Sequence, residues 1–164
     1  MNEDLKRKID RVKELIQKGR HASMATVNSD GSPHNTPFRF MHDAKLEHIY
    51  WASHPESLHS QNILRTGQIF VVLYDLIDRG GLYIKAEGGK ILKEDEVNEG
   101  LEIHNRLRKE EGKDPLPESY YGEESPQKMW RAKIKNLWIN NSERDANGIL
   151  VKDQRYEISA KDLI

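Results

Sequence analysis

Apolar residues near the start of the chain recur at helical spacing. They are Leu5, Ile9, Val12, Leu15 and Ile16, with Lys, Arg, Asp and Glu between them. The pattern predicts an amphipathic helix over residues 1–19, with Gly19 as its stop. A basic helix lying on a membrane surface is the alternative. The interspersed acidic residues and the lack of Trp and Phe favour a helix packed on the rest of the protein.

From His21 onward apolar and polar positions alternate, which is the period of a β-strand. Turn-forming residues fill positions 28–33 and 78–81, and they separate the alternating segments. The predicted strands cover residues 21–27, 34–42, 46–53, 68–75 and about 82–92. Gly88 and Gly89 lie inside the last of these strands and predict a β-bulge or a close backbone approach.

The second half of the chain returns to helical spacing before further strands. Residues 94–112 are predicted as an inserted helix, with Val97, Leu101, His104 and Leu107 on one face. The loop over residues 112–126 carries Tyr120 and Tyr121, and long loops of this kind often line a site or an interface. Strands are expected over residues 132–140 and about 155–159, with a hairpin turn at Asn147 and Gly148.

This order of elements predicts the fold class. Consecutive strands joined by short turns are typical of an antiparallel barrel or sandwich, here mainly β with flanking helices. Helices do not alternate with strands, so a Rossmann sheet is disfavoured. The fourth predicted strand, residues 68–75, is apolar on both faces. Its second face therefore needs a cover, either helices or another subunit.

Composition narrows the possible functions. The chain has 164 residues, and we expect a single domain over residues 1–164. The formal net charge of −1 gives no general attraction to nucleic acid or to an anionic membrane. There is no Cys, which excludes disulfides and thiolate chemistry. A charged N-terminus and the lack of a long apolar run indicate neither a secretory signal nor a membrane span, so a cytoplasmic protein is expected.

A polar turn between the third and fourth predicted strands is the strongest candidate for a binding site. Hydroxyls, imidazoles, amides and a guanidinium close to a helix start suit an oxyanion such as phosphate. The turn contains Ser53, His54, Ser57, His59, Ser60, Gln61, Asn62 and Arg65. The alternative is simple helix capping by Ser57, worth about 1 kcal/mol. The histidines do not follow a recognised ligand spacing, so no metal site is predicted.

Several segments, taken in order, resemble a known family. They are Ser-Met-Ala-Thr-Val-Asn at residues 23–28, the Asp-Gly turn at 30–31, Pro-Phe-Arg-Phe at 37–40, Tyr-Trp-Ala-Ser at 50–53, Ser-x-His-x-x-Asn-Ile at 57–63, Gln-Ile-Phe-Val-Val at 68–72 and Lys-Ala-Glu at 85–87. Together they resemble the pyridoxamine 5'-phosphate oxidase-like flavoproteins. The resemblance covers about residues 21–93 and implies the antiparallel, Greek-key FMN-binding split barrel.

The resemblance also implies a cofactor, FMN, held at a homodimer interface. Thr36, Pro37, Phe38 and Arg39 would then line the flavin. Trp51, Ala52 and Ser53 would lie near its ribityl chain and phosphate. Ser57 and His59 would bind the phosphate, and Asn62 would brace the turn.

The chain departs from the family pattern at three places. Leu58 and His59 stand where the family commonly has Lys preceded by Arg, and a His is a weaker cation unless phosphate raises its pKa. Arg39 and Arg65 are the candidates for the missing positive charge. Arg79 stands roughly where the true oxidases place a Gln that contacts the flavin. The pattern by which the true oxidases grip pyridoxal near the C-terminus is missing; residues 155–159 read Arg-Tyr-Glu-Ile-Ser. Fold and cofactor are therefore better supported than oxidation of vitamin B6.

The functional prediction is an FMN-dependent oxidoreductase that acts on an unknown small molecule, with an electron donor such as NAD(P)H. No catalytic acid or base is indicated. The alternatives are a non-catalytic module that binds flavin, deazaflavin or haem, and a structural dimer that has lost its ligand. FMN-type absorption of the purified protein separates the structural dimer from the other two.

Overall fold

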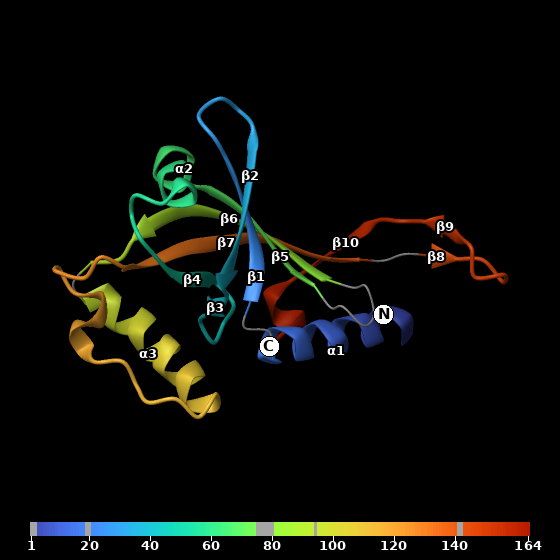
Figure 1. The fold of residues 1–164 in the computed structure, drawn as a ribbon. Coiled ribbons are helices and arrows are strands. Elements are labelled where there is room, and N and C mark those ends of the chain that lie inside the picture. Colours follow the sequence, from blue (N-terminus) through green and yellow to red (C-terminus); the bar gives the residue numbers. More distant parts are fainter. Residues whose placement is uncertain (1–2, 19–20, 75–80, 94, 141–142) are drawn as a thin grey trace.

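The computed structural model describes residues 3–18, 21–74, 81–93, 95–140 and 143–164 (Figure 1). The helices are α1 (Glu3–Lys18), α2 (Leu58–Thr66) and α3 (Asp95–Glu110), with short 3-10 turns η1 (Glu118–Tyr121) and η2 (Ala160–Asp162). The strands are β1 (His21–Val27), β2 (Pro33–Arg39), β3 (Met41–His42), β4 (His48–Ser53), β5 (Gln68–Tyr74), β6 (Gly81–Ile91), β7 (Lys128–Asn140), β8 (Glu143–Arg144), β9 (Leu150–Lys152) and β10 (Arg155–Ile158).

Eight of the strands form one curled antiparallel sheet. Its order is β2-β1-β5-β6-β7-β4-β3, and β10 pairs with β7 off this path. Figure 1 shows the sheet curling into a half-barrel with helices around it. A short turn joins β1 to β2 because neighbouring antiparallel strands need no long crossover. The predicted mainly β, antiparallel split barrel is confirmed.

The main core lies inside the curl of the sheet. Alternate residues of the strands point inward, as the period of two requires. Trp51 and Trp130 stack there with ring centroids 5.9 Å apart, and each is almost fully buried. α1 packs its apolar face, Ile9, Val12 and Ile16, on the same core. The predicted N-terminal helix therefore covers the barrel, as its amphipathic pattern indicates.

A second, smaller core lies between α3 and the outer face of β4 and β7. Its buried members are Met41, Tyr50, Leu92, Leu101, Ile103, Leu107, Tyr121 and Met129. Gly100 allows the close approach of α3, because a Cβ at this position would lie 2.5 Å from Cγ of Met129. Figure 1 shows α3 and the loop after it beside this outer face. The inserted helix is thus held by packing of its own.

Three strand boundaries differ from the predictions. The predicted strand over residues 34–42 is broken at Phe40, which is buried in the main core between β2 and β3. The third strand begins at His48 and not at residue 46, because Leu46 adopts a positive φ of 55° in the preceding turn. β7 begins at Lys128, four residues before the predicted start, where it pairs with Ser53 of β4.

The structure shows how far the chain itself covers the two apolar faces of β5, for which helices or another subunit are the predicted cover. Ile69, Val71 and Leu73 are buried inside the barrel. On the other face Phe70 and Val72 are half-buried and Tyr74 is exposed. The chain itself therefore covers only part of the second face.

The predicted irregularity at Gly88 and Gly89 is confirmed. The β6–β7 register shifts between Glu87 and Lys90, and a Cβ on Gly89 would lie 2.3 Å from the side chain of Ile63 in α2. The bulge therefore lets α2 lie close to β6. The predicted helix stop at residue 19 and most of the turn at 78–81 lie outside the described residues. Within the described part of the chain no helix is long and apolar enough to span a membrane.

Candidate functional site

The polar turn is organised by α2, which follows directly after β4. Ser53 ends β4, Ser57 is the N-cap residue of α2, and Gly67 ends the helix with a left-handed φ of 67°. The first backbone N–H groups of a helix have no acceptor in a preceding turn, and they carry the positive end of the helix dipole. The end of β4 therefore lies beside a group of backbone donors suited to an anion.

Four side chains meet at this helix start and form what we term the serine–histidine cluster: Ser53, Ser57, His59 and Ser60. Nε2 of His59 lies 2.7 Å from Oγ of Ser53 and 3.1 Å from Oγ of Ser57. Oγ of Ser57 donates to Oγ of Ser60 at 2.8 Å, and Ser60 donates to Ser53 at 3.1 Å. Ser57 makes no side-chain capping bond, and its hydroxyl bonds within the cluster.

The imidazole of His59 is held toward its neutral form. Burial, followed by the nearby His34 of β2, lowers the pKa of His59. The rings of His34 and His59 are stacked nearly parallel, with centroids 6.5 Å apart. Placing a phosphate here would oppose both effects, because a neighbouring anion favours the protonated imidazole. The serine–histidine cluster thus combines three hydroxyls with the imidazole of His59, and the His34 ring lies beside it.

Asn62 fixes the orientation of α2 on the barrel. It is buried, and its amide nitrogen donates to Oγ1 of Thr26 at 3.1 Å and to Oδ1 of Asn28 at 2.9 Å. Both acceptors belong to the end of β1 and the turn after it. From the last turn of the helix, the Arg65 guanidinium donates to the carbonyl of Val27. These contacts tie the middle and the C-terminal end of α2 to β1 and the turn after it.

The residues predicted to line a flavin divide between the two faces of β2. Thr36 and Phe38 are half-buried and alternate with exposed Pro37. Phe38 packs against the main core, on the same face of the strand as His34. Arg39 lies on the opposite face, as predicted, and meets α3 there. Successive side chains of a strand point in opposite directions. A ligand on one face of β2 therefore contacts only two of the four residues, and it can contact all four only at the edge of the strand.

Arg39 is paired with the inserted helix. Its Nη2 donates to Oε1 of Glu111, just after α3, at 2.6 Å, and both side chains are about four-fifths buried. Hydrogen bonds from Lys113 and then from Arg39 lower the pKa of Glu111 to about 2. Nε of Arg39 is buried without a protein partner. Arg39 and Arg65, the expected sources of a positive charge for the cofactor, each have a partner within the chain, Glu111 for Arg39 and the carbonyl of Val27 for Arg65.

Tyr121 and His104 form a second buried contact beside this ion pair. The Tyr121 hydroxyl lies 2.7 Å from Nδ1 of His104, and the two rings are stacked. Burial, followed by the charge of Arg39, lowers the pKa of His104 to about 4. The imidazole is therefore neutral at physiological pH, and a hydrogen bond joins its Nδ1 to the Tyr121 hydroxyl. We term Arg39, His104, Glu111 and Tyr121 the α3 cluster.

The two predicted site residues before Ser53 have different surroundings. Trp51 lies in the main core, stacked on Trp130, and its Nε1 is buried without a protein partner. Ala52 faces the other way and packs against the second core. The structure brings Ser53, Ser57 and His59 together directly, and it places Trp51 and Ala52 around them as packing groups.

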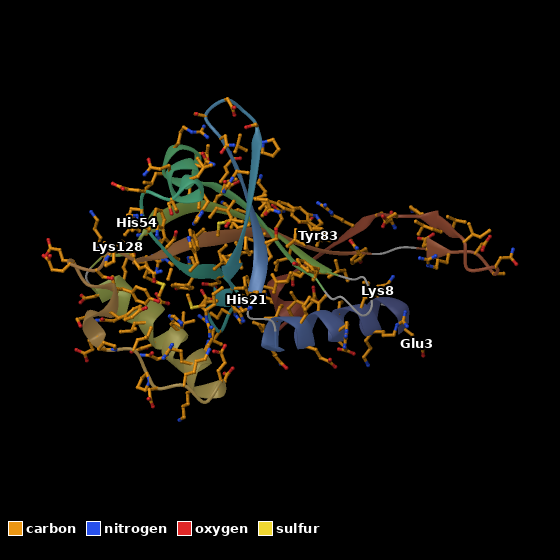
Figure 2. The ribbon with its side chains drawn as sticks, viewed as in Figure 1. Glu3, Lys8, His21, His54, Tyr83 and Lys128 are labelled. Carbon is orange, nitrogen blue, oxygen red and sulfur yellow. The ribbon has the colours of Figure 1, made fainter. Side chains whose placement is uncertain are left out.

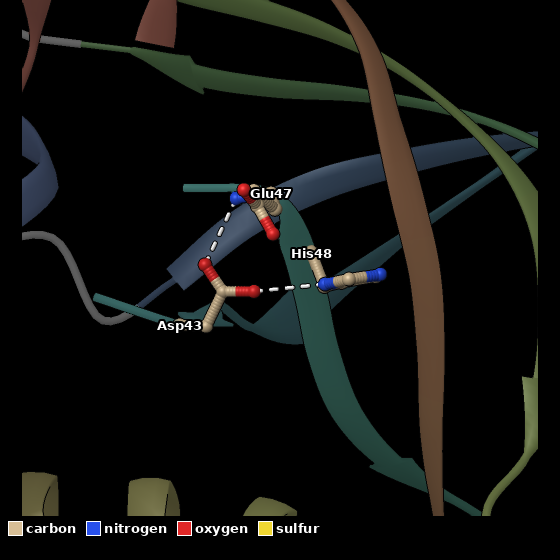
Figure 3. Close-up of side chains that lie close together, drawn as sticks. All are labelled: Asp43, Glu47 and His48. Carbon is tan, nitrogen blue, oxygen red and sulfur yellow. Dashed lines mark hydrogen bonds and ion pairs between the residues drawn. The ribbon is translucent and has the colours of Figure 1, made fainter. Parts of the chain in front are cut away.

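A second polar group gathers at the turn between β3 and β4 (Figure 3). Asp43, Glu47 and His48 place one potential ligand atom each within 4.8 Å of one another. Both oxygens of Asp43 are engaged within the turn: Oδ1 accepts the Glu47 N–H at 2.8 Å, and Oδ2 lies 2.9 Å from Nδ1 of His48. These bonds stabilise the turn in which Leu46 has its positive φ.

Two residues at the serine–histidine cluster, Ser60 and His34, were not among the predicted cofactor-binding residues. Ser60 is fully buried within the serine–histidine cluster, and His34 stacks on His59 from another strand. Ser60 follows Ser57 by three residues, and this spacing places two side chains on the same face of a helix. The sequence could therefore have indicated Ser60. The contact of His34 follows from the path of β2, which local sequence does not reveal.

Comparison with known proteins identifies the family. The family model described as pyridoxamine 5'-phosphate oxidase matches residues 9–142. The chain therefore belongs to the pyridoxamine 5'-phosphate oxidase family, as the resemblance implied. None of the curated proteins matches its sequence.

Solved structures share the fold at low sequence identity. A Clostridium acetobutylicum protein related to general stress protein 26 has a TM-score of 0.59 and 15% identity, over 93% of this chain and 96% of its own. An F420 reductase has a TM-score of 0.57 and 13% identity, over 77% and 94%. HutZ, a haem storage protein from Vibrio cholerae, has a TM-score of 0.59 and 17% identity, over 78% and 91%.

Proposed function

We propose that this chain is an FMN-binding flavoprotein, formed by a single domain, that acts as an oxidoreductase on a small molecule. The observation that carries the proposal is the serine–histidine cluster at the start of α2, in a chain of this family. Its hydroxyls and the adjacent backbone N–H groups fit a phosphate monoester. When bound, the flavin supplies the hydride or electron chemistry, with an electron donor such as NAD(P)H.

The chain's own residues have separate tasks in this proposal. Ser53, Ser57, Ser60 and His59 hold the phosphate, and Asn62 keeps α2 in place for them. Thr36 and Phe38 are the members of β2 that lie on the same face of the strand as His34. The donor set fits FMN through hydroxyls and protonatable imidazoles, and not through the Lys and Arg of the family pattern.

We further propose a homodimer with the cofactor at its interface. Phe70, Tyr83 and Trp138 form an aromatic face on the outer side of β5, β6 and β7. Phe70 lies 6.2 Å from Trp138 and 6.4 Å from Tyr83 between ring centroids. The guanidinium of Arg155 lies 4.0 Å above the ring of Tyr83. A half-buried aromatic group of this kind suits a protein partner.

Loss of the cluster tests the cofactor assignment. We expect the Ser57→Ala, His59→Ala double variant to bind FMN at least tenfold more weakly, since charge-assisted contacts are worth about 1.5–3 kcal/mol each. Titration followed by flavin fluorescence measures the affinity. His54→Ala is the control, because this imidazole is exposed and lies in the same turn outside the cluster. Unchanged affinity in the double variant would show that the phosphate lies elsewhere.

A second candidate function is binding of a deazaflavin or haem without turnover. Its support is the likeness to an F420 reductase and to a haem storage protein, together with His59 in place of a fixed cation. NAD(P)H oxidation by the FMN-loaded protein separates the two functions. Turnover supports the oxidoreductase, whereas a coloured protein without turnover supports the binding module.

A further inference from the structure

The side chain of His34 lies beside the serine–histidine cluster, although it comes from β2. Its ring is stacked on the ring of His59, with 6.5 Å between the centroids and 4° between the planes. Both side chains are half-buried, so each keeps part of its surface in contact with solvent. A ligand that bonds the hydroxyls around His59 would therefore lie beside His34 as well.

The register of the sheet and the contacts of α2 hold this pair of imidazoles in place. His34 lies opposite Thr26 in the β1–β2 pair, and directly opposite residues have their side chains on the same face. The amide of Asn62 in α2 donates to Oγ1 of Thr26 at 3.1 Å. His59 precedes Asn62 by three residues, so both lie on the same side of the helix. Figure 1 shows α2 beside β2, where these contacts occur.

The groups around the pair are uncharged. Ser53 and Ser57 bond His59, and Thr26 stands opposite His34. Among the described residues, the charge that acts on His59 is that of His34, which adds to burial in lowering the pKa of His59. Two protonated imidazoles repel each other, and a bound anion offsets this repulsion. A phosphate monoester carries about 1.5 to 2 negative charges at pH 7, which matches two imidazolium groups.

We propose that His34 is a further phosphate-binding residue, and that it forms with His59 a pair of imidazolium groups matched to a dianionic phosphate monoester. This inference rests on the FMN site proposed above and names the class of anion that the site takes. Unlike Lys or Arg, both groups are cations only when protonated, so binding of the phosphate takes up protons at two rings. A flavin without a phosphate gains nothing from either ring.

Comparison of FMN with riboflavin separates phosphate binding from a structural role of His34. We expect His34→Gln to weaken FMN binding about tenfold at pH 6.5, because a charge-assisted contact is lost. Riboflavin has no phosphate, so its affinity should stay within about twofold of wild type. Fluorescence titration measures both affinities. An equal loss for both flavins, or no loss for FMN, would overturn the proposal.

His54→Gln is the matched control for this substitution. His54 is an exposed imidazole in the turn before α2, where Figure 2 labels it, and it lies outside the serine–histidine cluster. The control variant should bind both flavins as wild type does. A loss of FMN affinity in His54→Gln as large as that in His34→Gln would show a general effect of removing a histidine, and it would overturn the specific role of His34.

A count of protons gives a second measurement that does not depend on riboflavin. Calorimetric titration with FMN at pH 7, in two buffers of different ionisation enthalpy, measures the protons taken up on binding. Wild type should take up more protons than His34→Gln, and His34→Gln more than the double variant with His59→Gln.

The outcomes separate this inference from the function on which it rests. Equal uptake by wild type and His34→Gln would overturn the role of His34 and leave the phosphate site at His59 standing. Equal uptake by all three proteins, with FMN bound, would overturn the phosphate site as well. A wild-type protein that binds no FMN would overturn the proposed function and this inference with it.

Discussion

The serine–histidine cluster joins the end of β4 to α2, and the α3 cluster joins β2 to α3 and η1, yet the two balance charge in opposite ways. The first consists of hydroxyls and an imidazole whose pKa is lowered. Among the described residues, no carboxylate forms a hydrogen bond with these uncharged groups. In the second, Arg39 already faces Glu111 at 2.6 Å. The comparison indicates that the first is suited to receive an anionic ligand, and that the second stabilises the attachment of α3.

The largest expected effect is a loss of stability when the ion pair of the α3 cluster is removed. Glu111→Gln removes the anion that faces a largely buried guanidinium, and we expect the free energy of unfolding to fall by about 1–2 kcal/mol at pH 7. Urea denaturation measures the change. Glu102→Gln, an exposed change on the same helix, should stay within about 0.5 kcal/mol of wild type. FMN affinity should not change, and a weaker FMN complex would show that the clusters act together.

The stability difference between wild type and Glu111→Gln should also depend on pH. The pKa of Glu111, about 2, lies below its ordinary value of 4.5. A carboxylate with a depressed folded pKa stabilises the protein above its unfolded pKa and loses that contribution as pH falls toward the folded value. The stability difference between wild type and Glu111→Gln should therefore be full at pH 6 and shrink between about pH 4.5 and pH 2. A difference that is constant over this range would contradict the ion-pair account.

A smaller effect is expected from the contact beside the ion pair. Tyr121→Phe removes the hydrogen bond between the hydroxyl and Nδ1 of His104, which should cost about 1 kcal/mol of stability. Tyr120→Phe is the matched control, because that ring is 40% exposed and lies next in the chain. Thermal and urea unfolding measure both. Equal stabilities would show that water replaces the hydroxyl without loss.

The smallest expected effect is the pH dependence of FMN binding at the serine–histidine cluster. Phosphate at the serine–histidine cluster should raise the lowered pKa of His59, so binding takes up a proton. FMN affinity should then rise about threefold from pH 7.5 to pH 6.5, or about 0.7 kcal/mol. Titration of His59→Gln over the same range is the control, and its pH dependence should be flatter. Parallel curves for the two proteins would remove His59 as the protonated group.

The strands and helices could be predicted because each depends on local spacing. The alternation of Ala22, Met24 and Thr26 is the burial pattern of β1, and the spacing of Ile9, Val12 and Ile16 is the buried face of α1. The errors lie where a local pattern continues across a break. Phe40 fits the alternation of β2, but the strand ends before it because the pairing partner changes, from β1 for β2 to β4 for β3.

The contacts of the candidate sites likewise divide into those that the sequence indicates and those that only the tertiary structure decides. Ser53, Ser57 and His59 lie within seven positions of one another, so the sequence alone indicated a polar group at a helix start. His34 over His59, and Arg39 with Glu111, 72 positions away, were decided only by the tertiary structure. The physical reason is that periodicity fixes which face of an element is buried, whereas the neighbour that meets this face depends on how the sheet curls and where the inserted helix packs.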